Sequence, residues 1–265
     1  MPKHKPRELT VALQAARAAE TVVMKYWRSR NTEKTKSNWR DPVTQADLAS
    51  DKIIRQILHR AFPTHNILSE EAAQDGSNSD WLWVIDPIDG TVNFTMGLPT
   101  FTVSIGLLHK GKPFLGVISA PALDELYIGV TGQGAWMHRK HEPQVRLATS
   151  KTTSLKQATF SMGFGYSDAQ RQLFLKQFPT LLLKSRAARI HYSATFDLMN
   201  VARGGLDFYI NTGISLWDYA AAWTIVQESG GQLLTTLGKP ITMGDANIIA
   251  INGPIKRSLY SHIIK

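Results

Sequence analysis

Two aspartates, Asp86 and Asp89, stand three residues apart directly after an apolar stretch of the sequence. That stretch, residues 81–85, is rich in tryptophan and β-branched residues, which is typical of a buried strand. Pro87 is expected to end the strand because proline cannot donate to a ladder. Carboxylates at the mouth of a buried strand are costly unless a cation compensates them, and Mg²⁺ prefers carboxylate and carbonyl oxygens. The pair therefore suggests a metal site that includes the Ile88 carbonyl, although a solvated turn explains the same residues.

Other acidic side chains occur beside expected helices and strands. Glu70 and Glu71 follow a short strand predicted over residues 65–68. Asp218 directly precedes an apolar segment that is expected to be helical, and Asp47 would be the N-cap of an earlier helix. Each aspartate taken alone fits a structural role, because aspartate is a routine helix cap.

Taken together, these segments resemble the signatures of one enzyme family. The matching segments, in chain order, are Glu70-Glu71, Asp86-Pro-Ile-Asp89-Gly-Thr91-Val-Asn-Phe94, Trp217-Asp218-Tyr-Ala-Ala-Ala222 and Glu228-Ser-Gly230-Gly231. They are similar to those of the inositol monophosphatase family, within the wider group of lithium-sensitive, Mg²⁺-dependent phosphatases. The resemblance runs from about residue 41 to about residue 231, and several independent motifs at family-like separations make it specific.

The resemblance implies how the acidic residues share metal ions. Glu70, Asp86 and the Ile88 carbonyl would hold one Mg²⁺. Asp86, Asp89 and Asp218 would hold a second, and a third, weaker ion would lie near Glu70. Four converging carboxylates would repel one another strongly without such cations. The implied chemistry is the two-metal clamp, which stabilises both the attacking and the leaving oxygen of a phosphoryl transfer.

The resemblance also implies a group that handles the attacking water. Thr91 and Asp47 match the family pair that orients this water and accepts its proton. The threonine hydroxyl can accept a hydrogen bond from water while donating to Asp47. With Glu70, these two residues form the predicted catalytic set, and Glu71 is expected to orient its neighbours rather than bind metal.

Substrate contacts are expected on both sides of the scissile bond. Gly90 and Thr91 open a segment whose backbone N–H groups favour an anion. On the alcohol side the chain departs from the family, which usually has glycine where Tyr192 stands and an acidic residue where Asn211 stands. Asn211 would offer a neutral carbonyl and a donor amide instead. The predicted substrate-binding residues are Asp89, Gly90, Thr91, Ser193, Ala194 and Asn211.

Composition limits the class of protein. With 265 residues, 43% of them hydrophobic and 19% charged, the chain suits a folded globular protein. The absence of cysteine excludes disulfides, thiolate metal sites and a cysteine nucleophile. No signal peptide or membrane span is recognisable, so we expect a cytoplasmic protein. The net charge of +9 suits an anionic substrate, whereas the scattered basic residues disfavour nucleic acid as the main partner.

Hydrophobic patterning predicts two different halves. Helices over 8–28 and 48–62, followed by a strand and a hairpin over 101–120, make residues 1–144 an α+β half with an antiparallel sheet and most metal ligands. Strands and helices alternate afterwards, which predicts an α/β half over 145–265 that completes the active site. The resemblance implies the layered α-β-α-β-α sandwich of the inositol monophosphatase and fructose-1,6-bisphosphatase type.

These inferences predict a Mg²⁺-dependent phosphomonoesterase. It would hydrolyse inositol 1-phosphate or a related small phosphate ester by attack of a metal-activated water. Alternatives in the same superfamily are a broad-specificity fructose-1,6-bisphosphatase, an NADP(H) phosphatase or a histidinol phosphatase. A non-enzymatic anion-binding module is disfavoured because it would not need the complete acidic set. We further predict a homodimer without membrane association.

Overall fold

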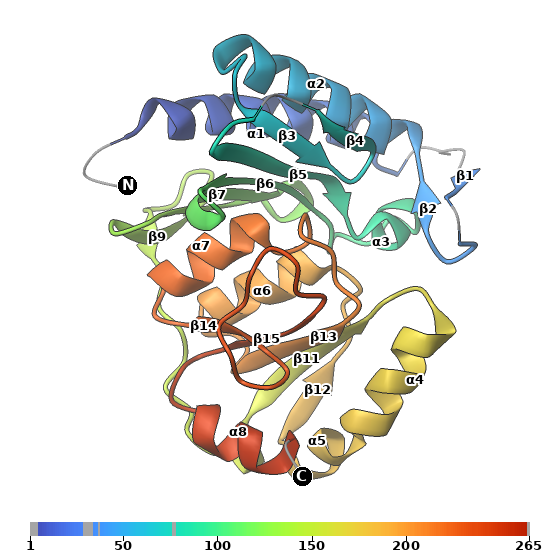
Figure 1. The fold of residues 1–265 in the computed structure, drawn as a ribbon, viewed down its shortest axis with the longest axis vertical. Coiled ribbons are helices and arrows are strands. Elements are labelled where there is room, and N and C mark those ends of the chain that lie inside the picture. Colours follow the sequence, from blue (N-terminus) through green and yellow to red (C-terminus); the bar gives the residue numbers. More distant parts are fainter. Residues whose placement is uncertain (1–4, 29–33, 37, 76–77, 264–265) are drawn as a thin grey trace.

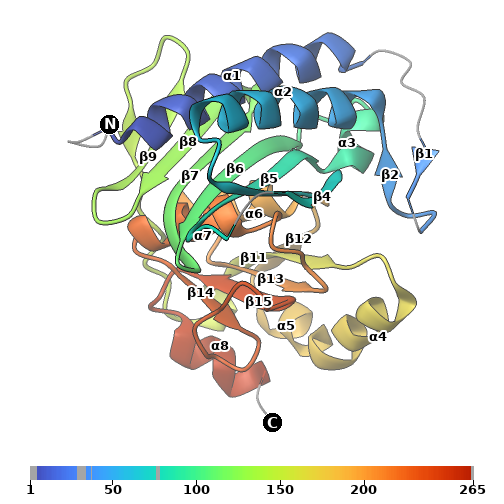
Figure 2. The same cartoon turned by 45° about the horizontal axis from the view of Figure 1, so that its top comes forward.

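The computed structural model describes residues 5–28, 34–36, 38–75 and 78–263, and its elements form five stacked layers (Figure 1). From one side to the other, the layers are helices α1 (Arg7–Tyr26) and α2 (Gln45–Ala61), a larger sheet, helices α6 (Ala194–Ala202) and α7 (Ala220–Glu228), a smaller sheet, and helices α4 (Asp168–Gln177), α5 (Pro179–Lys184) and α8 (Lys256–Ile263). The predicted α-β-α-β-α sandwich is therefore confirmed. Figure 2 shows α1 and α2 side by side across the larger sheet.

The larger sheet is antiparallel except where β3 and β5 run parallel, and its strand order is β10-β9-β8-β7-β6-β5-β3-β4. Its strands are β3 (Asn66–Ser69), β4 (Ala72–Asp75), β5 (Trp81–Asp89), β6 (Thr102–His109), β7 (Lys112–Ala120), β8 (Glu125–Val130), β9 (Gly134–Arg139) and β10 (Val145–Arg146). The short helix α3 (Thr91–Thr95) follows β5, and a 3₁₀ turn (Pro121–Leu123) joins β7 to β8. A small ribbon of β1 (Lys34–Thr35) and β2 (Pro42–Val43) lies near α3 (Figure 1).

The smaller sheet is mixed, with strand order β12-β11-β13-β15-β14. Strand β11 is parallel to both of its neighbours, and β15 is antiparallel to both of its own. The strands are β11 (Thr159–Phe164), β12 (Ala187–Arg189), β13 (Phe208–Thr212), β14 (Gln232–Thr235) and β15 (Asn247–Ile251), and a 3₁₀ turn (Leu155–Gln157) precedes β11.

Apart from β10, the strands of each sheet come from one of the two predicted halves. The larger sheet ends with β10, just past the boundary predicted at 144/145, and the smaller sheet begins at β11. One buried cluster nevertheless combines Val84 and Ile118 of the larger sheet with Leu198 of α6 and Ala221 of α7. This cluster packs residues of both predicted halves together, so the division into two halves stays a prediction.

A row of glycines lets α7 press directly on the larger sheet. Gly106, Gly116 and Gly129 are paired across β6, β7 and β8. A Cβ atom on Gly116 would lie 2.0 Å from the carbonyl oxygen of Ala221, which no side chain tolerates. This close approach fixes α7 on the sheet, and with it the position of Asp218 just before the helix.

Two local predictions were wrong. Strand β5 does not end at Pro87 but continues to Asp89, because a bulge accommodates the residue that cannot donate. Asp47 is not the N-cap of α2: the cap is Thr44, and Asp47 at N3 returns a hydrogen bond to it in a capping box.

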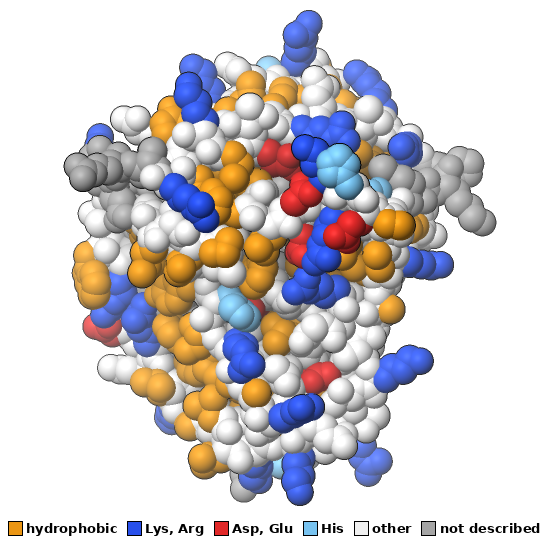
Figure 3. Space-filling view, turned by 180° about the vertical axis from the view of Figure 1, so that it is seen from behind, with side chains coloured by type: hydrophobic (Ala, Val, Ile, Leu, Met, Phe, Trp, Pro, Cys, Tyr) orange, Lys and Arg blue, Asp and Glu red, His pale blue; other side chains and the backbone are white. Residues whose placement is uncertain are grey.

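Apolar side chains gather on the surface where α4, α5 and β12 lie, on one side of the face in Figure 3. Leu175 is 68% exposed and Leu183 is 87% exposed, and Leu182 and Ile190 are also exposed. None of the helices in the described part of the chain combines the length and apolar character needed to span a bilayer.

Candidate active site

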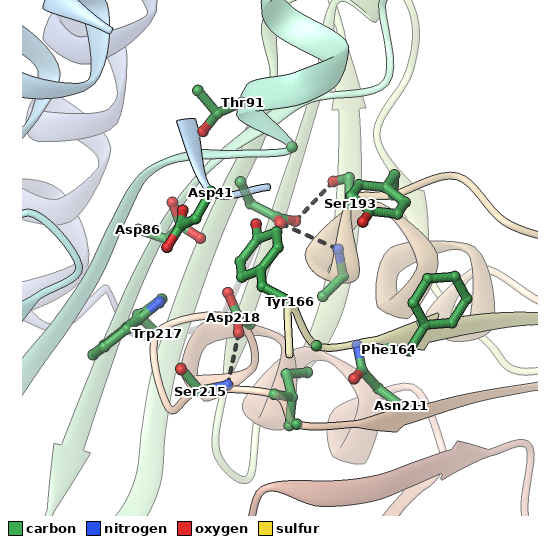
Figure 4. A pocket seen from close by; sticks show the side chains of 18 of the residues that line it. Asp41, Asp86, Thr91, Phe164, Tyr166, Ser193, Asn211, Ser215, Trp217 and Asp218 are labelled. Atoms are coloured by element: carbon green, nitrogen blue, oxygen red, sulfur yellow. Dashed lines mark hydrogen bonds between the residues drawn. The ribbon is translucent and has the colours of Figure 1, made fainter. Parts of the chain in front are cut away.

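Three aspartates from two distant parts of the chain meet in one pocket. One carboxylate oxygen from each of Asp86, Asp89 and Asp218 lies within 4.8 Å of the other two. The pocket has a volume of about 330 Å³, and Figure 4 shows Asp86 and Asp218 within it. Asp86 is 1% exposed, and neither of its carboxylate oxygens has a hydrogen-bond partner among the described residues. A buried carboxylate without donors fits a hard cation, which accepts oxygen ligands.

The electrostatics of the cluster favour the same interpretation. Burial raises the pKa of Asp86 and of Asp218 well above the ordinary aspartate value, and repulsion from neighbouring carboxylates raises both further. A cation bound among the three groups would reverse this effect by stabilising the charged forms. The residues present therefore fit a metal ion.

The bulge in β5 determines how its acidic residues are presented. Asp86 pairs with Ser104 and Asp89 pairs with Thr102, so that two residues of β5, Pro87 and Ile88, oppose one residue of β6. A bulge breaks the strict alternation of side chains along a strand, so Asp86 and Asp89 can both reach one pocket. The Ile88 side chain is buried, and this residue also lines the pocket.

The N-terminus of α6 holds Asp89 in place. Asp89 Oδ2 accepts hydrogen bonds from Ser193 Oγ at 2.7 Å and from the Thr195 N–H at 2.6 Å. Asp89 Oδ1 accepts from the Ala194 N–H at 3.2 Å, and two of these contacts are drawn in Figure 4. Ser193 and Ala194, which were predicted to bind substrate, line the pocket and here orient a predicted metal ligand.

Asp218 is not a helix cap. The N-cap of α7 is Tyr219, and Asp218 Oδ2 instead accepts from the Ser215 N–H at 2.7 Å (Figure 4). This turn fixes the carboxylate toward Asp86 and Asp89.

Glu70 lines the same pocket but pairs with a lysine. Lys36 Nζ lies 2.7 Å from Glu70 Oε1, 2.6 Å from Glu71 Oε1 and 4.0 Å from Asp41 Oδ1. Burial raises the pKa of Glu70 to about 7, and Lys36 opposes that rise. Burial lowers the pKa of Lys36, but its contacts with the two glutamates outweigh burial and raise it above the ordinary value. Sequence reasoning missed Lys36 because it lies in a polar segment without a recognisable motif.

Lys36 is expected to compete with metal for Glu70. Lys36→Gln should tighten Mg²⁺ binding by about tenfold, because a charge-assisted contact of about 1–3 kcal/mol no longer has to be broken. Calorimetric titration with Mg²⁺ measures this effect directly. Lys34→Gln, which removes an exposed charge from the same segment, is the matched control. Equal Mg²⁺ affinities in the wild type and in Lys36→Gln would contradict the competition.

Thr91 and Asp47 are in contact, as their predicted joint role requires. Thr91 Oγ1 lies 3.1 Å from Asp47 Oδ1 and 3.0 Å from the Ile88 carbonyl oxygen, so its single proton can go to either. The other carboxylate oxygen of Asp47 accepts from the Thr44 N–H at 2.8 Å and from the Thr44 hydroxyl at 2.6 Å. The cap and the contact with Thr91 thus use different oxygens of one side chain.

The far side of the pocket is neutral and aromatic. Asn211 is 8% exposed; its amide donates to the Tyr209 hydroxyl at 2.6 Å, and its carbonyl oxygen has no partner among the described residues. Gly163 is required here, because a Cβ atom would lie 2.4 Å from the Asn211 amide nitrogen. Sequence reasoning missed Tyr166, whose ring lies over the carboxylates in Figure 4. Burial and the nearby acids raise the pKa of the Tyr166 phenol above its ordinary value.

Comparison with known proteins identifies the family to which this chain belongs. The model of the inositol monophosphatase family matches residues 5–265. The chain belongs to the inositol monophosphatase family. An inositol-1-monophosphatase of Synechocystis is 35% identical over 254 residues, covering 95% of this chain and 86% of the relative. A protein named Nus factor SuhB from Pasteurella multocida is 34% identical over 260 residues, covering 96% of this chain and 95% of the relative.

A solved structure has the same fold. The extragenic suppressor protein suhB of Bartonella henselae superposes with a TM-score of 0.90 at 30% identity, covering 98% of this chain and 99% of that chain. Membership of the family makes the protein a phosphoric monoester hydrolase, and its acidic cluster can bind a metal ion.

Proposed function

We propose that the protein is a Mg²⁺-dependent phosphomonoesterase acting on inositol 1-phosphate or a related small phosphate ester. The observation that carries the proposal is the buried Asp86 carboxylate, which lies close to Asp89 and Asp218. Among the described residues its oxygens have no hydrogen-bond partner. Glu70, Asp86 and the Ile88 carbonyl would hold one ion, and Asp86, Asp89 and Asp218 a second. When bound, Mg²⁺ supplies a nucleophilic water at neutral pH and neutralises charge on the phosphoryl group.

The remaining residues act on the substrate and the water. Thr91 would accept a hydrogen bond from the attacking water, and Asp47 would take up the proton. Gly90 and Thr91 would donate backbone N–H groups to the phosphate at the start of α3. The water oxygen forms the new bond to phosphorus and the ester P–O bond breaks. The alcohol leaves with a proton taken from solvent, and Asp47 returns the proton of the attacking water to solvent.

Asn211 is the proposed determinant of a broad choice of alcohol. Its carbonyl oxygen, which has no partner in the described part of the chain, can accept a hydrogen bond from a substrate hydroxyl without adding negative charge to the pocket. Inositol 1-phosphate should therefore be hydrolysed without a strong preference over other esters.

Phosphate release tests this proposal. The substrates to compare are inositol 1-phosphate, fructose 1,6-bisphosphate, NADP, histidinol phosphate and 3′-phosphoadenosine 5′-phosphate, each with Mg²⁺ and with chelator. Asn211→Glu should shift kcat/KM toward inositol 1-phosphate by roughly tenfold, because a charged acceptor binds hydroxyls more strongly. Full turnover in chelator would overturn the metal mechanism, and a hundredfold wild-type preference for inositol 1-phosphate that Asn211→Glu leaves unchanged would overturn the role of Asn211.

Assembly and location remain proposals of the same kind. The exposed apolar side chains of α4, α5 and the end of β12 support a homodimer, since large apolar patches on soluble proteins mark contact surfaces (Figure 3). We also propose a cytoplasmic location.

A binding role without turnover is the second candidate. The relative named Nus factor SuhB and the net charge of +9 favour a macromolecular partner. The intact set of acidic and water-handling residues supports turnover as the main function.

A further inference from the structure

One tyrosine of the candidate active site carries a hydroxyl that is not engaged by its neighbours. Tyr166, Tyr192 and Tyr209 all line the pocket. The Tyr209 hydroxyl accepts a hydrogen bond from the Asn211 amide, and the Tyr192 hydroxyl accepts one from Arg171 Nη2, each at 2.6 Å. Tyr166 is 37% exposed, and its hydroxyl has no hydrogen-bond partner in the described part of the chain. The Tyr166 phenol is therefore open to a molecule bound in the pocket.

The backbone of Tyr166 is nevertheless held from several sides. The residue lies in the turn between β11 and α4, where the Gly165 N–H donates to the Thr212 carbonyl oxygen at 2.7 Å. The Tyr166 carbonyl oxygen accepts from Arg40 Nη1 at 2.9 Å and from Asn38 Nδ2 at 3.2 Å. The next residue along the chain is the N-cap of α4 and forms a capping box. The ring is thus placed before a substrate binds, and such preorganisation is what makes a donor effective in catalysis.

The Tyr166 hydroxyl faces the acidic cluster. In Figure 4 its ring stands between Asp86 and Asn211, with the hydroxyl at the end toward the acidic residues. Burial raises the pKa of the phenol, and the charges of Asp218 and Glu70 raise it further. A phenol keeps its proton at neutral pH in any case, because its ordinary pKa is about 10. Tyr166 is therefore a neutral donor at the boundary between the metal-binding side of the pocket and the side proposed for the alcohol.

A hydrogen-bond donor at this boundary has a clear use in ester hydrolysis. In the proposed mechanism, Gly90 and Thr91 donate to the phosphate, and Asn211 accepts from a hydroxyl of the alcohol. None of the proposed side chains donates to the ester oxygen, which gains negative charge as its bond to phosphorus breaks. A preorganised donor aimed at such a developing charge typically contributes about 10²–10³ in kcat.

We propose that the Tyr166 hydroxyl donates a hydrogen bond to the ester oxygen of the bound substrate, which makes Tyr166 a catalytic residue. As the P–O bond breaks, its electron pair stays with the alcohol oxygen, and the phenol stabilises the charge that develops there. The phenol keeps its own proton, and solvent protonates the alcohol. The inference rests on the proposed phosphatase function and adds a residue to its chemistry.

A series of esters that differ in the leaving group tests this role. The series is 4-nitrophenyl phosphate, phenyl phosphate and inositol 1-phosphate, whose leaving groups are progressively more basic. Tyr166→Phe keeps the ring and removes only the hydroxyl. The kcat for inositol 1-phosphate should fall by about a hundredfold with little change in KM, because an alkoxide needs the donor most. The kcat for 4-nitrophenyl phosphate should fall by about tenfold or less, because its leaving group is already stable.

Binding of Mg²⁺ separates this role from a role in holding metal. Calorimetry should give the same Mg²⁺ affinity for the wild type and for Tyr166→Phe, because the phenol is not among the proposed ligands. A parallel loss of Mg²⁺ affinity and turnover would assign the hydroxyl to the metal site and overturn the inference. The control is Tyr260→Phe on α8, which removes a hydroxyl that donates to the Thr235 carbonyl oxygen at 2.8 Å. This variant should retain the wild-type rates, and the same losses in it would overturn the inference as well.

The ester series also distinguishes a failure of this inference from a failure of the proposed function. If the wild type hydrolyses all three esters and Tyr166→Phe slows them equally, the phosphatase function stands and the contact with the ester oxygen is refuted. If the wild type in Mg²⁺ hydrolyses none of them, the phosphatase proposal itself is refuted, and the role of Tyr166 is refuted with it.

Discussion

Asp86→Asn is expected to remove nearly all Mg²⁺-dependent phosphate release while stabilising the folded protein in chelator. Asp86 is buried at the centre of the cluster, and its oxygens have no other partner among the described residues. Loss of the ligand shared by both proposed ions should lower kcat by roughly a thousandfold or more, the factor that corresponds to several kcal/mol of Lewis-acid stabilisation.

The expected gain in stability in chelator comes from removing the buried charge of Asp86. Without a cation, burial and repulsion raise the pKa of Asp86, so the folded protein holds protons that the unfolded chain has lost. The free energy of unfolding in chelator should therefore fall as pH rises above the ordinary aspartate range. Asp86→Asn removes this charge and should add about 1–2 kcal/mol at neutral pH. It should also make the pH dependence of stability shallower.

Thermal unfolding between pH 5 and pH 8, in chelator and in Mg²⁺, checks both parts of this expectation. Mg²⁺ should stabilise the wild type at neutral pH and have little effect on Asp86→Asn, because ligand binding to the folded state raises stability. Asp80→Asn, which changes an exposed aspartate, is the control for charge alone. Retained turnover in Asp86→Asn, or a loss of stability in chelator, would show that Asp86 is not a metal ligand under strain.

The second large effect is expected at the contact between Thr91 and Asp47. Thr91→Val keeps the shape of the side chain but removes the hydroxyl that contacts Asp47. We propose that this hydroxyl bridges the attacking water and the carboxylate. General-base catalysis typically contributes about 10²–10⁴ in rate, so Thr91→Val and Asp47→Asn should each slow turnover within that range. Because the two groups would act as a unit, the double variant should be little slower than either single one.

Asp47 also serves the capping box, so stability must be measured beside turnover. Thr44→Ala weakens the cap, which uses Asp47 Oδ2, but it leaves the contact between Thr91 and Asp47 Oδ1 in place. It should cost about 1 kcal/mol of stability and far less turnover than Asp47→Asn. Fully multiplicative losses in the double variant would instead assign Asp47 mainly to the helix start.

Sequence alone predicted the residues whose roles depend on local geometry. Asp86, Ile88 and Asp89 belong to one strand, so their proximity follows from the chain itself. Sequence did not predict the bulge that aims both aspartates into one pocket, because the partner strand and its register create it. Aspartate before a helix predicted a cap at Asp47 and left a cap as the alternative to metal binding at Asp218. The structure assigns a different local contact to each.

By itself, the sequence predicted the family and the acidic set, because linear motifs encode them. It predicted the layered fold because the family resemblance implies it. The tertiary structure alone decided which side chains meet. Asp218 joins the cluster because α7 packs on a row of glycines whose register spans three strands. Lys36 contacts Glu70, and Arg171 contacts Tyr192. In both pairs the residues are far apart in the sequence, so no local sequence pattern predicts the contact. Contacts between residues distant in sequence depend on packing and strand register, which no window of neighbouring residues contains.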